Sequence, residues 1–436
     1  MTSAVAETPT ITGRGRTLAW ALWDWGSSAF NAVATTFVFT VYITGKAFEG
    51  GPGDPSALLG WGLGAAGIVV LLIAPVTGQR TDASGRRKLW LAVNTAVVVA
   101  CLAAMFFIQS SPDYLLAGIA LLAVGTVFFE VAGVNYNAML AQVSTPASVG
   151  RVSGFGWGMG YLGGIVLLLI VYFGFIKPDV GLFGVTDEGG LSVRVSMVIA
   201  AVWFALFALP VLFAVPENRV PAEQRRQKVG FFRSYAVLAG DIARLWKTSR
   251  QTVYFLLASA IFRDGLTGVF TFGGVLAAGT FGFSAGDVIV FAIAANVVAG
   301  ISTISVGVLD DRIGPKPVIL TSLIGLVIAG SLVFILHDAG TTAFWVFGLV
   351  LCLFVGPAQS ASRTFLARLI PRGREGEVFG LYATTGRAAT FLAPTMWSVF
   401  ITIGGEQYWG ILGIVVVLAL GLALLIPVKA RQQQLG

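Results

Sequence analysis

The stretch Gly78–Lys88 reads GQRTDASGRRK, and a related stretch, Gly307–Pro317, reads GVLDDRIGPKP. A glycine, an aspartate and a second glycine occupy positions 0, 4 and 7 of both stretches: Gly78, Asp82 and Gly85, then Gly307, Asp311 and Gly314. The offset of 229 residues is close to half of the 436-residue chain. A second pair of segments, MLAQVSTPASVGRVSGF and FLARLIPRGREGEVFGL, aligns Pro146 with Pro371 at an offset of 225 residues. Two motifs repeated at nearly one offset predict two homologous halves.

The composition places these halves in a membrane. The chain is 56% hydrophobic and only 11% charged, with a mean hydropathy of +0.85, whereas a soluble domain carries about 25% charged residues. A helix needs about 20 apolar residues to cross a bilayer. Twelve such runs predict an all-α protein of two six-helix bundles, with spans at 18–43, 57–79, 89–109, 114–138, 152–176, 193–215, 251–277, 285–308, 317–337, 342–362, 377–402 and 408–428.

The distribution of basic residues predicts the orientation. If the N-terminus is cytoplasmic, the cytoplasmic segments hold 22 of the 28 lysines and arginines and the external loops hold 3. Lysine and arginine collect in cytoplasmic loops, so both termini are predicted to be cytoplasmic, in the plasma membrane. This bias explains the net charge of +7 without a nucleic-acid partner.

The charge pattern also divides the chain. We expect a disordered cytoplasmic tail at 1–16, an N-terminal half at 17–216, a basic cytoplasmic linker at 217–250, a C-terminal half at 251–428 and a second tail at 429–436. Within the linker, Phe231–Trp246 is predicted to form an amphipathic helix along the membrane surface.

Several function classes find no support in the sequence. His337 is the only histidine, and Cys101 and Cys352 lie inside apolar runs, which argues against zinc sites, histidine triads and disulfides. The motif G-x-G-x-x-G at 158–163 lies within apolar helix rather than after a strand, so a dinucleotide site is rejected. We therefore predict no cofactor, no metal and no enzymatic activity. A sensor is usually marked by a large soluble domain, and none is evident.

Glycines are also concentrated in two predicted spans, in GWGLGAAG (60–67) and GFGWGMGYLGG (154–164). Small residues at this density allow helices to approach closely in a membrane.

The duplicated loop resembles the signature loop of the major facilitator superfamily. Ala83 and Pro315 depart from that pattern, which often has basic residues there. A narrower resemblance rests on WALWDWGSSAFNAVATTFVF, NYNAML, GRVSGFGWGMGYLGG and VFGLYATTGRAATFLAP. These segments look like those of the fungal vacuolar amino-acid effluxers of autophagy and their bacterial relatives. The resemblance implies the major facilitator fold and a small-molecule substrate.

The loop residues are candidates for a gate. The resemblance implies that Asp82 faces the start of the eleventh span and Asp311 the start of the fifth, where helix N-termini carry partial positive charge. Such contacts favour the state closed to the cytoplasm; the alternative is an ordinary charge at a helix end. The predicted gating residues are Gly78, Asp82, Arg86, Arg87, Gly307, Asp311 and Arg312.

Ionisable residues inside spans are costly and are functional candidates by default. Glu130 in the fourth span and Asp24 in the first are candidates for proton coupling, because apolar surroundings favour a neutral carboxyl group. A salt bridge is the alternative for Glu130, and an acid in the first helical turns of an aromatic belt is the alternative for Asp24. Arg363, at the end of the tenth span, is expected to reach the interface. The predicted substrate-binding residues are Asn31, Arg263, Asp264, Gln359 and Arg387.

Arginines suit an anionic group and Asp264 a cationic one, so a zwitterionic amino acid satisfies both. We predict a monomeric, alternating-access secondary transporter of a small polar solute, most simply an amino-acid effluxer that is proton-coupled. A proton-coupled drug or sugar transporter is the alternative, and a non-transporting sensor is disfavoured.

Overall fold

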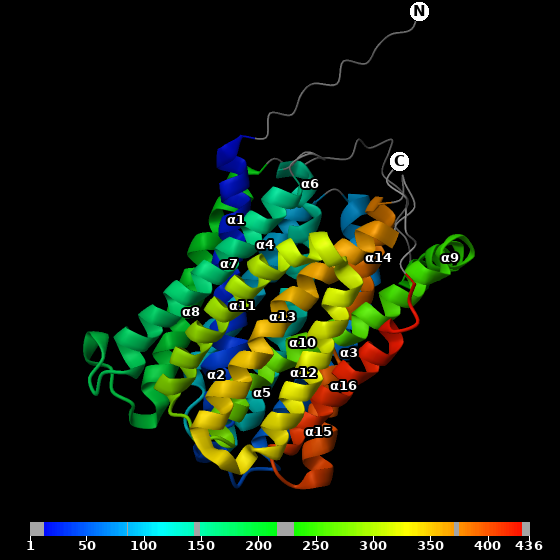
Figure 1. Cartoon of the computed structure of the whole chain (residues 1–436). Coiled ribbons are helices and arrows are strands. Elements are labelled where there is room, and N and C mark those ends of the chain that lie inside the picture. Colours follow the sequence, from blue (N-terminus) through cyan, green and yellow to red (C-terminus); the bar gives the residue numbers. More distant parts are fainter. Residues whose placement is uncertain (1–12, 85, 144–148, 216–230, 370–374, 430–436) are drawn as a thin grey trace, which may run out of the picture.

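A computed structural model describes residues 13–84, 86–143, 149–215, 231–369 and 375–429. The predicted tails and the first part of the predicted linker fall mostly outside these ranges, as do Gly85, Pro146 and Pro371 of the repeated motifs. No strand occurs in the described ranges, and ten helices there are long and apolar enough to cross a membrane. The long helices run roughly side by side (Figure 1).

Each of the twelve predicted spans corresponds to a helical segment. The N-terminal half contains α1 (Arg14–Ser28), the π-helix η1 (Ala29–Phe37), α2 (Phe39–Ile43), α3 (Pro55–Ser84), α4 (Arg87–Ala104), α5 (Leu115–Ala138), α6 (Leu140–Val143), α7 (Val149–Val171) and α8 (Leu191–Ala214). The C-terminal half contains α10 (Arg250–Gly279), α11 (Ala285–Ile313), α12 (Pro315–Ile335), α13 (Gly340–Leu369), α14 (Glu375–Ala388), α15 (Leu392–Gly404) and α16 (Trp409–Leu425). The last helix, α16, follows the eleventh span, which is formed by α14 and α15 together.

The first and eleventh spans are interrupted where the sequence predicts continuous helices. In η1 the hydroxyls of Thr35 and Thr36 both donate to the Asn31 carbonyl, at 2.8 and 2.7 Å. In the eleventh span Pro394 has no N–H to continue the helical hydrogen bonds, so the helix breaks just before it. Both interruptions fall in spans that carry predicted site residues, as helix irregularities frequently do.

The linker contains α9 (Phe231–Thr248), so the predicted helix is present. It packs against α3 and α10, and the hydroxyl of Tyr235 donates to the Leu72 carbonyl at 2.6 Å. In Figure 1 it lies at the margin of the bundle, near α14.

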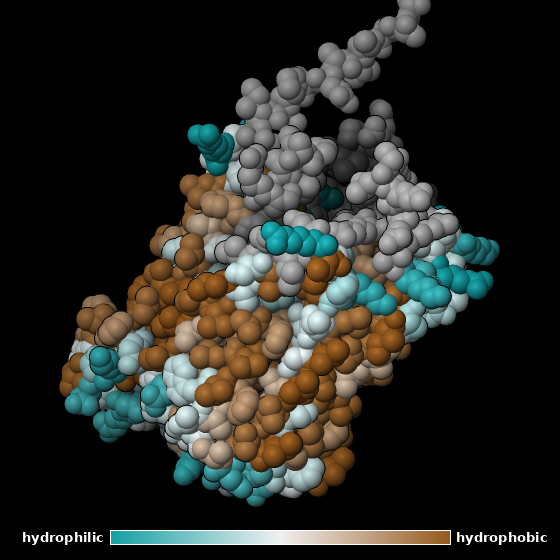
Figure 2. All heavy atoms as spheres, in the orientation of Figure 1, coloured by the Kyte–Doolittle hydropathy of each residue, from teal (hydrophilic) through white to brown (hydrophobic). Residues whose placement is uncertain are grey.

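The two ends of the bundle differ in composition. We call the end at which α1 begins and α16 ends the basic end, since Arg14, Arg86, Lys88 and Arg312 lie there; the other is the opposite end. Between them the surface is a broad apolar band (Figure 2) that includes exposed Leu72, as expected of a surface that faces lipid.

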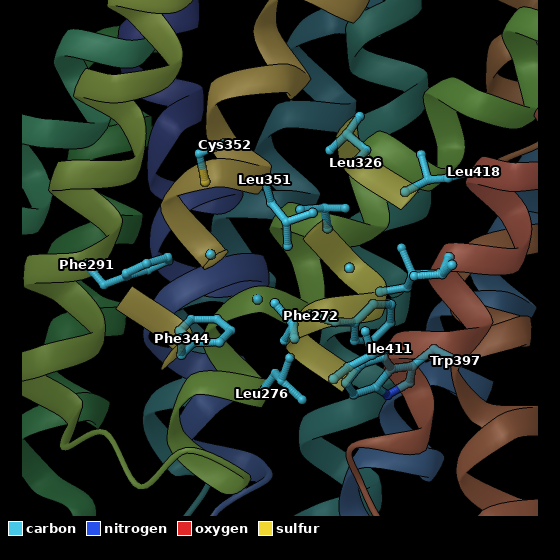
Figure 3. A pocket seen from close by; sticks show the side chains of 17 residues that line it. Phe272, Leu276, Phe291, Leu326, Phe344, Leu351, Cys352, Trp397, Ile411 and Leu418 are labelled. Atoms are coloured by element: carbon cyan, nitrogen blue, oxygen red, sulfur yellow. The ribbon is translucent and has the colours of Figure 1, made fainter. Parts of the chain in front are cut away.

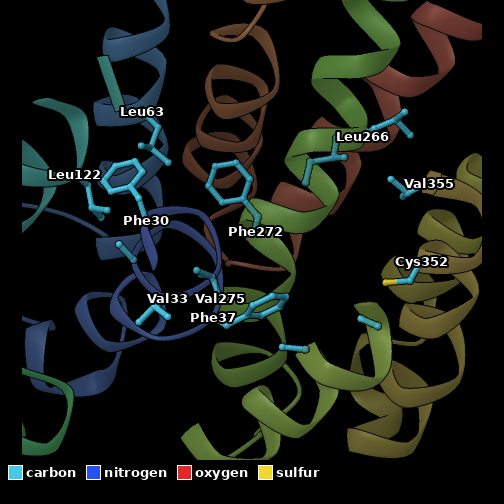
Figure 4. Packing of buried hydrophobic residues seen from close by; sticks show 14 of the residues in the cluster. Phe30, Val33, Phe37, Leu63, Leu122, Leu266, Phe272, Val275, Cys352 and Val355 are labelled. Carbon is cyan, nitrogen blue, oxygen red and sulfur yellow. The ribbon is translucent and has the colours of Figure 1, made fainter. Parts of the chain in front are cut away.

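The core runs through both halves. Phe30, Val33 and Phe37 of η1 are buried and lie among residues of α3, α5 and α10 (Figure 4). The first span therefore connects the hydrophobic cores of the two halves.

Candidate functional site

An ion pair joins the two halves. Arg387 Nε of α14 lies 3.0 Å from Glu130 Oε2 of α5, and the two side chains are 16% and 29% exposed. Arg387 is the last residue but one of α14, just before the break in the eleventh span. Glu130 therefore forms the salt bridge that was the alternative to a role in proton coupling. Its partner, Arg387, is a predicted substrate-binding residue.

A second arginine lies beside this pair. The Arg263 guanidinium of α10 is 4.1 Å from the centre of the Tyr382 ring, and its Nη1 donates to the Tyr382 carbonyl at 3.3 Å. The charges of Arg363, Arg387 and Glu130 all act on Arg263. The Tyr382 hydroxyl is hydrogen-bonded to Ser362, which fixes the ring on which Arg263 stacks. We call Glu130, Arg263, Arg363 and Arg387 the charged cluster.

Arg363 contacts an aromatic residue of the other half. Its guanidinium, on α13, lies 5.0 Å from the ring centre of Trp157 in α7, and its charge also acts on Tyr161 of that helix. The contact crosses from one half to the other. The expectation that Arg363 reaches the membrane interface stays a prediction. Sequence reasoning missed Trp157 and Tyr161 because an aromatic residue in a membrane helix gives no signal of function by itself.

Asp264, although adjacent to Arg263, is used elsewhere. Its Oδ2 accepts a hydrogen bond from the backbone N–H of Ala393 at 2.5 Å, and the residue is only 4% exposed. It thus satisfies a free N–H in the first turn of α15. Binding of a cationic group by Asp264 stays a prediction, and Glu130 is the described acid nearest the arginines.

Asp24 belongs to a separate cluster within the N-terminal half. Its Oδ2 accepts a hydrogen bond from the Tyr136 hydroxyl at 2.8 Å. The rings of Trp20 and Trp23 stack on Tyr136, with centroids 4.5 and 4.4 Å away. Gly156 and Gly160 of α7 approach Asp24 closely. Tyr136 is the functional candidate that sequence reasoning passed over, although the quoted segment NYNAML contains it.

The two predicted amides lie on opposite halves. Asn31 is exposed in η1, and its carbonyl accepts the two threonine hydroxyls described above. Gln359 is half-buried in α13, one turn before Arg363. The structure does not bring either amide into the charged cluster, so their contact with a solute stays a prediction.

The predicted gating residues are only partly described. Gly78 and Asp82 belong to α3, and Gly307 and Asp311 to α11, but their side chains lie outside the described part. Three basic candidates are described at the basic end: Arg86 and Arg312 are exposed, and Arg87 is half-buried. The predicted contacts with the fifth and eleventh spans stay predictions.

At the opposite end the halves are in close contact. In α15, Trp397 Nε1 donates to the Ser56 carbonyl at 3.2 Å, and Ser398 Oγ donates to the Ala57 carbonyl at 2.9 Å. A Cβ added to Gly67 of α3 would lie 2.6 Å from the Phe391 nitrogen. The predicted close approach through the glycine-rich second span is therefore confirmed, and it joins the two halves at this end.

An apolar pocket lies within the C-terminal half (Figure 3). Its lining includes Phe272, Phe291, Phe344, Leu351 and Trp397, with no charged side chain. It lacks the groups that a charged solute needs, so the charged cluster is the better candidate site.

Comparisons with known proteins agree with this arrangement. Residues 141–435 match the family described as "Vacuole effluxer Atg22 like". YxiO of Bacillus subtilis (strain 168), described as an uncharacterized MFS-type transporter, is 24% identical over 408 residues, which are 93% of either chain. Autophagy-related protein 22 of Cryptococcus neoformans var. neoformans serotype D (strain B-3501A) is 26% identical over 304 residues, 64% of this chain. The chain spans about half the length of that fungal relative, 52%.

Solved structures show the same fold. A D-xylose-proton symporter superposes with a TM-score of 0.65 at 15% identity, covering 94% of this chain and 96% of the symporter. The nucleoside transporter NupG gives a TM-score of 0.61 at 13% identity, with 94% of this chain and 98% of NupG covered. The chain is a multi-pass membrane transporter of the major facilitator type, and it belongs to the vacuole effluxer Atg22-like family.

Proposed function

We propose that the protein is a secondary transporter that moves an amino acid by alternating access, in the direction of efflux and coupled to protons. The observation that carries this proposal is the Glu130–Arg387 ion pair between the halves. Both groups are partly exposed, and each has a charge opposite to one end of a zwitterion.

Arginine and carboxylate suit the two ends of an amino acid. The planar guanidinium groups of Arg387 and Arg263 match a carboxylate with two parallel hydrogen bonds. Glu130, rather than Asp264, is assigned to the ammonium group, because Asp264 is already bonded to Ala393. Asn31 and Gln359 remain candidates for further polar contacts.

Proton coupling is assigned to Glu130. A proton on this carboxylate removes its charge and releases Arg387, so the proton and the substrate ammonium group compete for one acid. Asp24, whose carboxylate accepts a hydrogen bond from Tyr136, is the second candidate for proton coupling. Its protonation would act on the movement of the N-terminal half rather than on the solute. In the described conformation the two halves are joined at the opposite end; Asp82 and Asp311 are proposed to hold the basic end closed in the alternate state.

We place the protein in the plasma membrane as a monomer, with both termini cytoplasmic and α9 on the membrane surface between two six-helix halves. The excess of lysine and arginine in the loops of the basic end supports this orientation. Protease or thiol-reagent access to tags at the two termini in sealed vesicles tests it directly.

The runner-up is a proton-coupled transporter of drugs or sugars. The apolar pocket of Figure 3 favours an apolar drug. However, its lining comes from the C-terminal half alone. A solute moved by alternating access binds between the two halves, so that each side of the membrane becomes accessible in turn.

Uptake by purified protein in proteoliposomes tests the proposal. We expect at least one member of a labelled amino-acid panel to be exchanged and to accumulate under a pH gradient, and we expect both activities to need a higher concentration of that amino acid in Arg387→Ala. Flux of a sugar or a lipophilic drug with no amino-acid flux would overturn the substrate assignment.

A further inference from the structure

The charged cluster contains more positive than negative charge. It holds three guanidinium groups, of which those of Arg363 and Arg387 both act electrostatically on Arg263, and the described residues supply one ion-paired carboxylate, Glu130. Arg263 and Arg387 are partly buried, and two such charges facing one carboxylate are costly unless a further anion compensates them. Stacking on Tyr382 and Trp157 stabilises two of the guanidinium groups but leaves their charge in place.

Arg363 is the arginine of the cluster whose hydrogen-bonding capacity is entirely unused within the described part of the chain, whereas Arg263 and Arg387 each make one hydrogen bond. Its stacking partner Trp157 covers a face of the guanidinium, whereas the N–H donors point outward along its edge. Within the described part of the chain it makes no hydrogen bond or ion pair, and it is exposed. A planar cation that is held by an aromatic ring and has free donors is suited to a carboxylate or phosphate oxygen pair.

Position argues against a purely interfacial role for Arg363. It contacts a residue of the other half, and its charge acts on Arg263 and on Tyr161. Arg363 and Arg387 are thus both within electrostatic reach of Arg263.

We propose that the transported solute carries a second acidic group, as an acidic amino acid does, and that Arg363 on Trp157 is the residue that selects for it. This inference rests on the proposed amino-acid transport. The α-carboxylate binds Arg387, the ammonium group binds Glu130, and the side-chain carboxylate binds Arg363 with Arg263 beside it. A neutral amino acid leaves the excess of two positive charges unchanged, and an acidic one reduces it to one.

The test is transport of labelled glutamate and leucine by the same proteoliposomes, with wild-type protein, Arg363→Gln and Arg363→Lys. Arg250→Gln is the matched control, because Arg250 is also exposed and stacks on a tryptophan, Trp246, at 5.6 Å, but lies at the start of α10. We expect glutamate to be preferred by wild type. Arg363→Gln is expected to raise its KM roughly ten- to a hundredfold, the value of one charged hydrogen bond, with the leucine KM unchanged.

Arg363→Lys is expected to recover part of the glutamate affinity, and Arg250→Gln to leave both substrates unaffected. Leucine flux without glutamate flux, or an equal loss for both substrates in Arg363→Gln, overturns this inference and leaves the proposed function standing. Flux of neither amino acid class overturns both.

Discussion

The two ends of the molecule join the same halves by different chemistry. At the opposite end, α3 and α15 meet through glycines, with indole and hydroxyl donors on backbone carbonyls. Toward the basic end, the halves are joined by the Glu130–Arg387 ion pair and by Arg363 on Trp157. Close backbone packing depends on shape alone, whereas an ion pair depends on protonation and on competing ions. We therefore expect solute and protons to act on the charged connection, while the glycine-lined contact stabilises the described conformation.

The largest effect is expected from breaking the charged connection. Arg387→Ala removes the ion-pair partner of Glu130 and a group proposed to bind the substrate carboxylate. The binding free energy lost with one charged hydrogen bond is about 1.5–3 kcal/mol. We expect the KM for the transported amino acid to rise roughly ten- to a hundredfold, measured as uptake into proteoliposomes. Arg250→Ala, which removes an exposed arginine at the start of α10, serves as a control for charge. Equal KM values in wild type and Arg387→Ala would remove Arg387 from the site.

The next effect comes from filling the glycine-lined contact. In Gly67→Ala the new Cβ would lie 2.6 Å from the Phe391 nitrogen, and such overpacking costs about 1–3 kcal/mol. We expect the opposite end to open, seen as faster labelling of cysteines introduced in the loop between α15 and α16, together with slower transport. Gly158→Ala is the matched control, since nothing lies within 4 Å of its Cβ. If the two alanine variants behave alike, the tight contact does not set the conformation.

The smallest effect is expected from the duplicated loops. Asp82→Asn and Asp311→Asn each remove a charge–dipole interaction worth about 0.3–1 kcal/mol. A modest shift toward forms open at the basic end is expected, reported by weaker crosslinking between cysteines at the basic ends of α3 and α14. Unchanged crosslinking in Asp82→Asn contradicts the gating role.

The sequence predicted the fold well because its signals were strong and local. Each of the twelve apolar runs corresponds to a helical segment, ten helices in the described ranges are long and apolar enough to cross a membrane, and the glycines of the second span correctly indicated a close helix approach. The helix irregularities in the first and eleventh spans were not predicted. Pro394 offered a signal for one of them, whereas the π-helix depends on how Thr35 and Thr36 bond back to Asn31.

The site could be predicted only as a set of residues. Arg263, Arg387 and Glu130 were expected from the cost of charge in a membrane, and the structure brings them together. Which acid neutralises which base depends on tertiary contacts, so Asp264 was assigned to the solute although its carboxylate bonds to Ala393. Trp157 and Tyr136 were missed, and the contact of Arg363 with Trp157 was not foreseen, because these contacts form between distant spans.

The central claim is that Glu130 couples the proton to the solute through Arg387, and Glu130→Gln tests it most directly. Glutamine resembles the protonated acid, so the variant is expected to exchange labelled amino acid across the proteoliposome membrane while a pH gradient no longer drives accumulation. Asp24→Asn, which alters an acid bonded to Tyr136, is the control and is expected to slow both processes. Full pH-driven accumulation by Glu130→Gln would contradict the account.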